Sequence, residues 1–471
     1  MLELPIIEKE NLDRLHNATL QVLSETGIKL SHPETINLLI DHGATRREDR
    51  ILMPVDLVEY CISLIETKVY LQGRDPLNKI DLSNPTFFAH NVGGVPNVFE
   101  LKSQSRRPAA RADNITATRL LDALPNVSSI TPLYTPQDVP GAEMTLWMSY
   151  DTLNNTTKPF RAPGMQTGDE VKALSEMVQI ACPDGKVTVG ISPVSPLSFP
   201  DNIVEAIVAV ARSGFIFGPL PCPILGATSP MSIAGGLVQQ NAEVLASVII
   251  AQLVRPGTPV IYKGRLSVMD PRTGLSIWGN PEIGLISAAT VDLAHYYGMP
   301  ADIYGLCTNA HNPNFQSGYE RAFNALMPVL AGADEISGIG ELESGLSSSL
   351  TQIVLDDEIL SSIHRLQRGF EIDDDSLGVE VINNAMNGSQ NYLAQKHTVQ
   401  YLRRGEILDT QLAARETWSQ WDKAGRQDIL DRAQEKANNL GVHHEVPPLR
   451  GEQIAELERL IRVFGSEHHS T

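Results

Sequence analysis

The chain has 471 residues, of which 42% are hydrophobic and 20% charged, the usage of a folded globular protein with one large domain or a few average ones. Its 56 acidic and 37 basic residues give a net charge of −19, which would repel a phosphate backbone and excludes nucleic acid as an expected partner. The longest apolar run, near Ala242–Val254, is interrupted by polar residues and is too short for a bilayer, so we expect no membrane segment.

The amino-terminal residues and the cysteines indicate where the protein works. The opening MLELPIIEKENLD has acidic residues where a secretory signal needs basic ones. Cys61, Cys182, Cys222 and Cys307 stand far apart, without the local spacing of zinc ligands. We therefore expect a cytoplasmic protein, cysteines that act as small buried residues, and no metal bound by this chain.

Residues 1–84 predict helices followed by a hairpin. Apolar residues from Leu12 to Leu23 recur at helical spacing, and Gly27 follows where a C-cap is expected. Ser31 and Glu34 have the spacing of a capping box, which predicts a second helix. Residues 69–82 then predict a hairpin that turns at residues 74–78.

From residue 85 to residue 375, short apolar or glycine-rich runs alternate with amphipathic stretches. The eight runs begin near Phe87, Ser128, Phe160, Val187, Ile216, Pro259, Ala301 and Glu335. Helices are expected between them, for example at 142–153, 170–180, 202–210, 239–253, 281–296 and 319–330. Eight strands joined by crossover helices predict a (β/α)8 TIM barrel. An open doubly wound sheet is the competing fold, less favoured because no strand opens on GxGxxG.

Residues 376–471 predict a helical appendix without a second catalytic domain. Residues 392–402 carry an apolar helical face, and ETWSQWDKAGRQDILDRAQEKANNL is typical of long helices. Trp418 and Trp421, three residues apart, are predicted to pack on the barrel.

In such a barrel the loops after the strands form the active-site face, so polar residues at the ends of the runs are the candidates. They are His90, Asn91, Tyr134, Arg161, Ser192, Thr228, Lys263, Asn309, His311, Glu341 and Glu343. Neither GxSxG nor HExxH is present, which makes a hydrolase a minority hypothesis. A dyad of His311 with Asp302 or Asp334 stays open.

Four motifs resemble those of the trimethylamine methyltransferase family. They are TSPMSIAGGLVQQNAE at 228–243, NTTKP at 155–159, QSGYER at 316–321 and HTVQYLR at 397–403. The resemblance extends from the amino-terminal helices to about Leu449. It implies a (β/α)8 barrel that moves a methyl group from a methylated amine to the cobalt of a corrinoid carried by a separate small protein. We also expect the protein to form a homo-oligomer.

The founding members of that family carry pyrrolysine at the end of the eighth strand, in a stretch similar to GIGELESGL. This chain has Ser344 where pyrrolysine is expected. Members without pyrrolysine are similar to enzymes that demethylate quaternary amines, so the resemblance implies glycine betaine as the substrate. Proline betaine, carnitine, γ-butyrobetaine and trimethylamine are the alternatives, as is a barrel that binds betaine without catalysis. The loop at 308–314 lacks the acidic residue and lysine expected there, which leaves the exact substrate open.

A trimethylammonium group has no N–H to donate, so we expect aromatic faces and carboxylates to bind it. The aromatic residues at or near predicted strand ends are Phe87, Phe88, Phe99, Tyr134 and Phe315. Arg161, Asn309 and His311 are the predicted donors to a betaine carboxylate, and His90 and Asn91 are further predicted contacts.

Glu341 and Glu343 stand two residues apart in IGELESGLSSS. If the eighth strand continues through Glu343, alternation places both on one face at the barrel mouth. Such a pair is typical of glycoside hydrolysis. Beside a methylammonium the two carboxylates would instead supply negative charge that stabilises the cation, and Ser344 would leave open the space that a pyrrolysine side chain fills.

We expect Glu343→Gln to lower betaine turnover far more than it lowers stability, because the neutral amide would remove one of the negative charges beside the cation. Steady-state rates and thermal unfolding of the variant check this. Equal activity of the variant and the wild-type protein would indicate that the two glutamates are ordinary solvated residues at a strand end.

Overall fold

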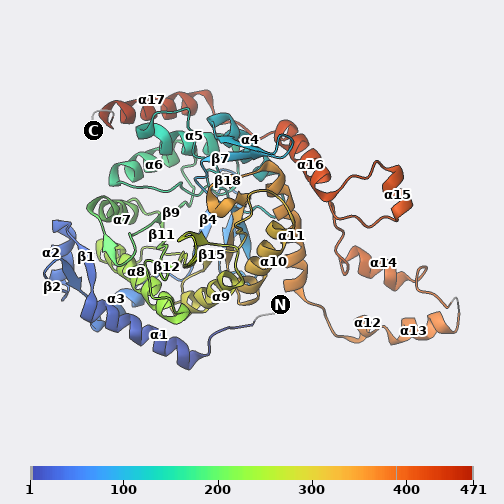
Figure 1. Cartoon of the computed structure of the whole chain (residues 1–471), viewed down its shortest axis with the longest axis horizontal. Coiled ribbons are helices and arrows are strands. Elements are labelled where there is room, and N and C mark those ends of the chain that lie inside the picture. The colour runs from blue at the N-terminus through green and yellow to red at the C-terminus, as the bar shows by residue number, and fades with distance from the viewer. Residues whose placement is uncertain (1–3, 389, 469–471) are drawn as a thin grey trace.

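The computed structural model describes residues 4–388 and 390–468 and shows a closed parallel barrel (Figure 1). Its strands are, in chain order, β6 (Phe88–Asn91), residues 129–130, residues 160–161, β9 (Thr188–Ile191), β11 (Ile216–Pro219), residues 260–262, β15 (Asp302–Tyr304) and β16 (Glu335–Ile339). Each pairs in parallel with the next, and β16 pairs with β6. The eight-stranded barrel is confirmed, and the open sheet is wrong because the first and last strands are hydrogen-bonded.

Helices form a ring around the strands. They are α4 (Arg111–Ala123), α5 (Met144–Asn155), α6 (Gly168–Ala181), α7 (Asp201–Ser213), α8 (Ile233–Val254), α9 (Pro281–Tyr296), α10 (Phe315–Leu330) and α11 (Leu350–Arg368). Each packs against the next, and α11 packs against α4. Local signals explain the boundaries: Thr167 and Glu170 form a capping box at the start of α6, and Gly214 ends α7 in the left-handed conformation.

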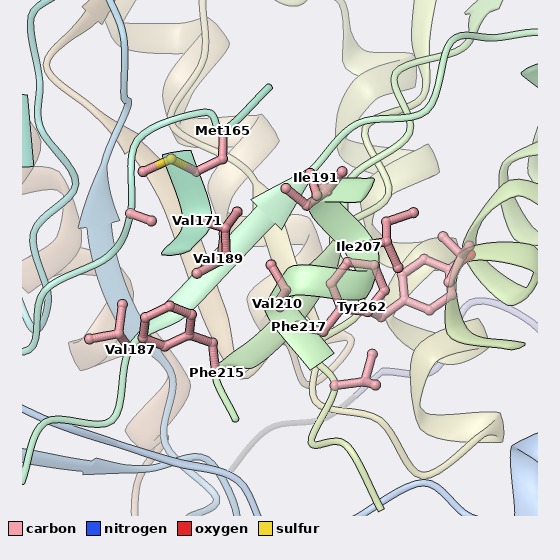
Figure 2. Packing of buried hydrophobic residues seen from close by; sticks show 14 of the residues in the cluster. Met165, Val171, Val187, Val189, Ile191, Ile207, Val210, Phe215, Phe217 and Tyr262 are labelled. Atoms are coloured by element: carbon pink, nitrogen blue, oxygen red, sulfur yellow. The ribbon is translucent and has the colours of Figure 1, made fainter. Parts of the chain in front are cut away.

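The hydrophobic core lies between the outer face of the barrel and these helices. Figure 2 shows Val189 of β9 and Phe217 of β11 near Ile207 and Val210 of α7. These four side chains are fully buried. Within the described residues, α8 is the one helix long and apolar enough to cross a membrane, but 78% of its most apolar window is buried inside the protein. We therefore assign α8 to the core.

The amino-terminal segment packs beside α8. It comprises α1 (Lys9–Gln21), the π-helical turn η1 (Val22–Thr26), β1 (Ile28–Leu30), α2 (Pro33–Asp41), β2 (Thr45–Arg47), β3 (Arg50–Leu52), α3 (Val55–Ser63) and the hairpin β4 (Tyr70–Gln72) and β5 (Lys79–Asp81). The predicted hairpin is confirmed. The predicted cap of α2 is wrong: His32 caps it through Thr35 N, because the Ser31 hydroxyl instead donates to Asp201. β1 also pairs with β10 (Ser198–Phe199), which ties this segment to the barrel.

The carboxy-terminal helices fall into two groups (Figure 1). α12 (Asp374–Leu377), α13 (Val379–Met386), α14 (Lys396–Arg403) and α15 (Trp418–Lys423) reach away from the barrel, whereas α16 (Ile429–His443) packs on α4 and α11 and α17 (Gly451–His468) on α5 and α6. Trp418 is 71% exposed and contacts Trp421 with ring centroids 5.0 Å apart. The prediction that this pair packs on the barrel is therefore wrong, because α15 lies in the outward group.

Candidate functional site

A cavity of about 340 Å³ opens at the carboxyl ends of the barrel strands. Its polar and aromatic lining comprises His90, Asn91, Thr131, Arg161, Ser192, Lys263, Arg265, Trp278, Asp302, Tyr304, Ser337 and Ser344. Of the predicted site residues, the structure brings together here His90, Asn91, Arg161, Ser192, Lys263 and Ser344.

Asp302, the first residue of β15, is the centre of the charge network at the cavity floor. Its Oδ2 lies 2.6 Å from Arg161 Nη2, 3.1 Å from His90 Nε2 and 3.2 Å from Lys263 Nζ, and its Oδ1 lies 2.6 Å from Arg265 Nη2. Burial would raise the pKa of Asp302, but His90, Lys263 and the two arginines hold it well below its ordinary value. Asp302 is therefore ionised across the physiological pH range.

Arg161 is a structural member of this network. Its guanidinium binds both carboxylate oxygens of Glu335, at 2.5 and 3.2 Å, in addition to Asp302, and its side chain is 2% exposed. Together with a contact from Nη1 to Ser129 Oγ, these hydrogen bonds occupy four of the five guanidinium N–H donors. The predicted role of Arg161 as a donor to a substrate carboxylate stays a prediction, and these contacts leave it few free protons.

Trp278 and Tyr304 form an aromatic wall. Their ring centroids are 5.1 Å apart at an interplanar angle of 85°. Tyr304 ends β15, whereas Trp278 follows the short hairpin of β13 (Ser267–Met269) and β14 (Ser276–Ile277). Sequence reasoning missed both: Tyr304 lies in a predicted run where its aromatic side chain was a usable signal, but Trp278 lies in an irregular insertion.

Ser344 occupies a tight turn at the cavity edge. β16 is followed by β17 (Glu341–Leu342) and by the 3-10 turn η3 (Glu343–Gly345), in which Ser344 has φ 57° and ψ 36°. Asn309 Nδ2 donates to Ser344 Oγ at 2.7 Å, while Asn309 Oδ1 accepts from Trp278 N at 2.8 Å. Asn309 thus joins the serine turn to the aromatic wall instead of lining the cavity.

The eighth strand does not continue through Glu343, so the predicted geometry of the glutamate pair is wrong. The backbone turns at Gly340, with φ 85°, and again in η3, which sends the two side chains to different environments. Glu341 is fully buried and accepts from Thr308 N at 2.8 Å. Glu343 pairs instead with Arg106 and Ser347, both at 2.7 Å.

Burial raises the pKa of Glu341 from its ordinary value near 4.5 to about 8. A carboxyl with a raised pKa contributes stability that is complete below about pH 4.5 and is lost as the pH rises to about 8. Between these two pH values the free energy of unfolding should fall by up to about 1.4 kcal/mol per pH unit, and we expect Glu341→Gln to lack this fall. Urea unfolding at pH 5 to 9 measures it. Parallel pH profiles of the variant and the wild-type protein would contradict the expectation.

The remaining predicted site residues lie outside the mouth cavity. Phe99 and Tyr134 line a second cavity of about 290 Å³ between the barrel and α16. His311 and Phe315 project outward, with the phenyl group 87% exposed, and His311 Nδ1 lies 3.5 Å from Glu343 Oε1. The structure therefore does not bring Phe99, Tyr134 and Phe315 together as one cage.

This cavity, lined by charged and aromatic residues, lies at the carboxyl ends of the (β/α)8 strands, which is the position of barrel active sites. Among the described residues, no group of three His, Cys, Asp or Glu side chains is arranged to hold a metal ion. The fold and this cavity define the chain as a (β/α)8 barrel protein with a cavity at the usual position of a barrel active site.

The chain belongs to the trimethylamine methyltransferase (MTTB) family, whose sequence profile matches residues 2–463. It is similar to the trimethylamine methyltransferase MttB of Desulfitobacterium hafniense, with 28% identity over 98% of this chain and 94% of that protein. It is also similar to a glycine betaine methyltransferase from the same species, with 27% identity over 98% of this chain and 97% of that protein.

The solved monomethylamine methyltransferase MtmB of Methanosarcina barkeri has a similar structure. The TM-score is 0.51 at 13% sequence identity, covering 93% of this chain and 89% of that chain. The likeness shows a common fold.

Proposed function

We propose that this protein transfers a methyl group from a small quaternary amine, with glycine betaine the best candidate, to the Co(I) corrinoid of a separate partner protein. The observation that carries the proposal is the position of Ser344. Its side chain lines the mouth cavity at the point where the family resemblance implies pyrrolysine. A serine leaves that space to the substrate.

The aromatic wall supports a quaternary amine as the substrate. Trp278 and Tyr304 line the cavity, and cation–π contacts with aromatic rings contribute about 0.5 to 2 kcal/mol each. A quaternary ammonium already carries its charge, so its tertiary amine leaves without protonation. The residues of the cavity therefore have to position the methyl carbon and exclude water.

The size of the cavity supports a partner protein. About 340 Å³ holds a small amine but not a corrinoid ring, so the corrinoid has to be presented at the mouth. The corrinoid supplies a strong nucleophile for the methyl carbon. Because the corrinoid would reach the methyl group from outside the mouth, the barrel could enclose the rest of the amine.

Incubation of the protein with a reduced Co(I) corrinoid and each candidate amine tests the proposal. We expect glycine betaine to change the cobalt spectrum to that of the methylated cofactor, with smaller rates for proline betaine, carnitine and γ-butyrobetaine. If no amine methylates the cobalt, the proposal is wrong. A higher rate with trimethylamine than with any betaine would instead indicate a pyrrolysine-independent trimethylamine enzyme. Calorimetric binding of betaine without transfer to any corrinoid protein would indicate a binding barrel.

A further inference from the structure

The mouth cavity carries more positive charge than its carboxylates balance. Arg161 is paired with Glu335, and Arg265 is paired with Asp302. Even with His90 neutral, the ammonium of Lys263 remains as one surplus positive charge. An isolated trimethylammonium would be repelled by this floor, whereas a carboxylate would be attracted to it.

Lys263 is buried but incompletely paired. It is 5% exposed, and among the described residues its ammonium has one polar contact, Asp302 Oδ2 at 3.2 Å. An ammonium has three protons to donate, and a buried charge is costly when its donors lack acceptors. Because Lys263 lines the cavity, a bound anion would supply the missing acceptors.

The neighbouring strand makes room for this lysine. Gly218 of β11 lies beside the Lys263 stem, and a Cβ there would come within 2.7 Å of Lys263 Cδ and Cε. Any side chain at position 218 would displace the stem. The local sequence therefore permits a buried cation at this point of the cavity.

We propose that Lys263 binds the carboxylate of the substrate, so that the protein selects quaternary amines that carry a carboxylate over choline and trimethylamine. This inference rests on the proposed function and names its substrate class. Arg265 Cζ lies 6.0 Å from the Tyr304 ring centre, so the anion subsite and the aromatic wall are adjacent. That spacing fits a short zwitterion.

Calorimetric titration without any corrinoid tests the subsite, using glycine betaine and choline, which share a trimethylammonium group. We expect the wild-type protein to bind betaine more tightly, and Lys263→Met to weaken betaine binding by roughly 10- to 100-fold while choline affinity does not fall, because the charge that repels choline is removed. Burial lowers the pKa of Lys263 to about 8, so betaine affinity should fall above that pH while choline affinity does not.

Lys158→Met is the matched control. Lys158 is another largely buried lysine, but its ammonium donates to the carbonyls of Leu121 and Leu124, away from the cavity. This variant should lower stability without changing the ratio of the two affinities. Equal binding of betaine and choline, or equal weakening of both by Lys263→Met, would overturn the subsite. Selective betaine binding without methyl transfer would instead contradict the proposed function alone.

A separate surface lies on the arm, which we define as residues 370–388 and 390–404 and which carries α12, α13 and α14 (Figure 1). Its exposed large apolar side chains are Phe370, Ile372, Leu377, Val379, Ile382, Met386, Tyr392, Leu393, Val399 and Leu402. Among the three helices of the arm, Ala385 is the one buried residue. Helices this short are unstable in water unless their apolar face is covered.

The barrel has an apolar surface of matching character. Phe315, Tyr319 and Phe323 are exposed at successive turns of α10. A groove of about 400 Å³ beside Phe315 continues over Leu355 and Ile359 of α11. Exposed apolar patches of this kind mark protein interaction sites.

We infer that the arm of one copy binds the α10–α11 groove of a second copy, and that the exchange is reciprocal. The arm and the groove are carried by the same chain, so a two-fold axis covers both surfaces and closes the assembly. A stable interface buries roughly 800 Å² per partner. The ten apolar side chains of the arm are each between 42% and 87% exposed and are therefore available for burial in such an interface.

Analytical ultracentrifugation of the full chain tests the exchange. We expect an even-numbered oligomer, with dissociation toward the monomer in Ile382→Asp on the arm and in Phe323→Asp on α10. Mixing these two variants should restore a dimer, because one intact arm and one intact groove remain. Leu77→Asp, in the exposed turn between β4 and β5, should leave the mass unchanged. A monomeric wild-type protein would overturn the inference, and so would variants whose oligomer mass is unchanged. Variants that lose only the binding of a corrinoid protein would also overturn it.

Discussion

Ser344→Leu should lower the rate of methyl transfer from a quaternary amine by roughly 100-fold, because displacement of a reacting group by about 1 Å can cost that much. Ser344 lines the mouth cavity, and the isobutyl group would occupy the space beside the aromatic wall. The measurement is the rate of cobalt methylation at saturating amine and corrinoid protein. Circular dichroism and thermal unfolding establish that the variant is folded.

Ser344→Gly is the matched control. Its φ of 57° suits glycine, so this variant loses only the hydroxyl that accepts from Asn309. We expect its rate to stay within several-fold of the wild-type rate, on the order of one lost hydrogen bond. If leucine and glycine gave equal rates, the cavity edge at position 344 would not contact the substrate.

Asp302→Asn should lower the free energy of unfolding by about 3 to 5 kcal/mol, since it removes one partner of a buried ion network and leaves the cations without compensation. Arg161, Lys263 and Arg265 all contact this carboxylate. Urea unfolding at pH 7 measures the loss. The depressed pKa of Asp302 adds a second signature: stability present above about pH 4 is lost as the pH falls further, and the variant lacks this dependence.

Two further variants distinguish the loss of charge compensation from the general effect of a substitution on stability. Asp270→Asn removes an exposed pair with Arg272 and should cost no more than about 1 kcal/mol. Addition of Lys263→Met to Asp302→Asn should restore part of the stability, because one unbalanced cation is then absent. A loss in Asp302→Asn no larger than that in Asp270→Asn would show that the network is not electrostatically coupled.

The eight barrel strands were predictable because each is a short apolar run followed by a helix of amphipathic pattern, and such patterns depend on local residues only. The strands at 129–130, 160–161 and 260–262 are very short, yet their order and parallel pairing are as predicted. The mouth cavity is lined by His90, Asn91, Arg161, Ser192 and Lys263, which the ends of the predicted runs indicated, and by Ser344, which the family resemblance indicated. Their contacts with a substrate stay predictions.

The composition of the site was less predictable. Trp278 lies after an irregular hairpin, where no periodic pattern exists, and two turns around Gly340 and Ser344 break the alternation that paired Glu341 with Glu343. Distances along the chain of more than a hundred residues separate Asp302 from His90 and Arg161, so the ion network depends on closure of the barrel.

The sequence by itself determined the barrel and, through its motifs, the methyltransferase family, because apolar periodicity and motif order are properties of the linear chain. Only the tertiary structure decided which charges meet. It buried Glu341, tied Glu343 to Arg106, and left Lys263 as the surplus cation at the cavity floor. Burial and charge pairing depend on distances in space, which the turn at Gly340 and the closure of β16 onto β6 set.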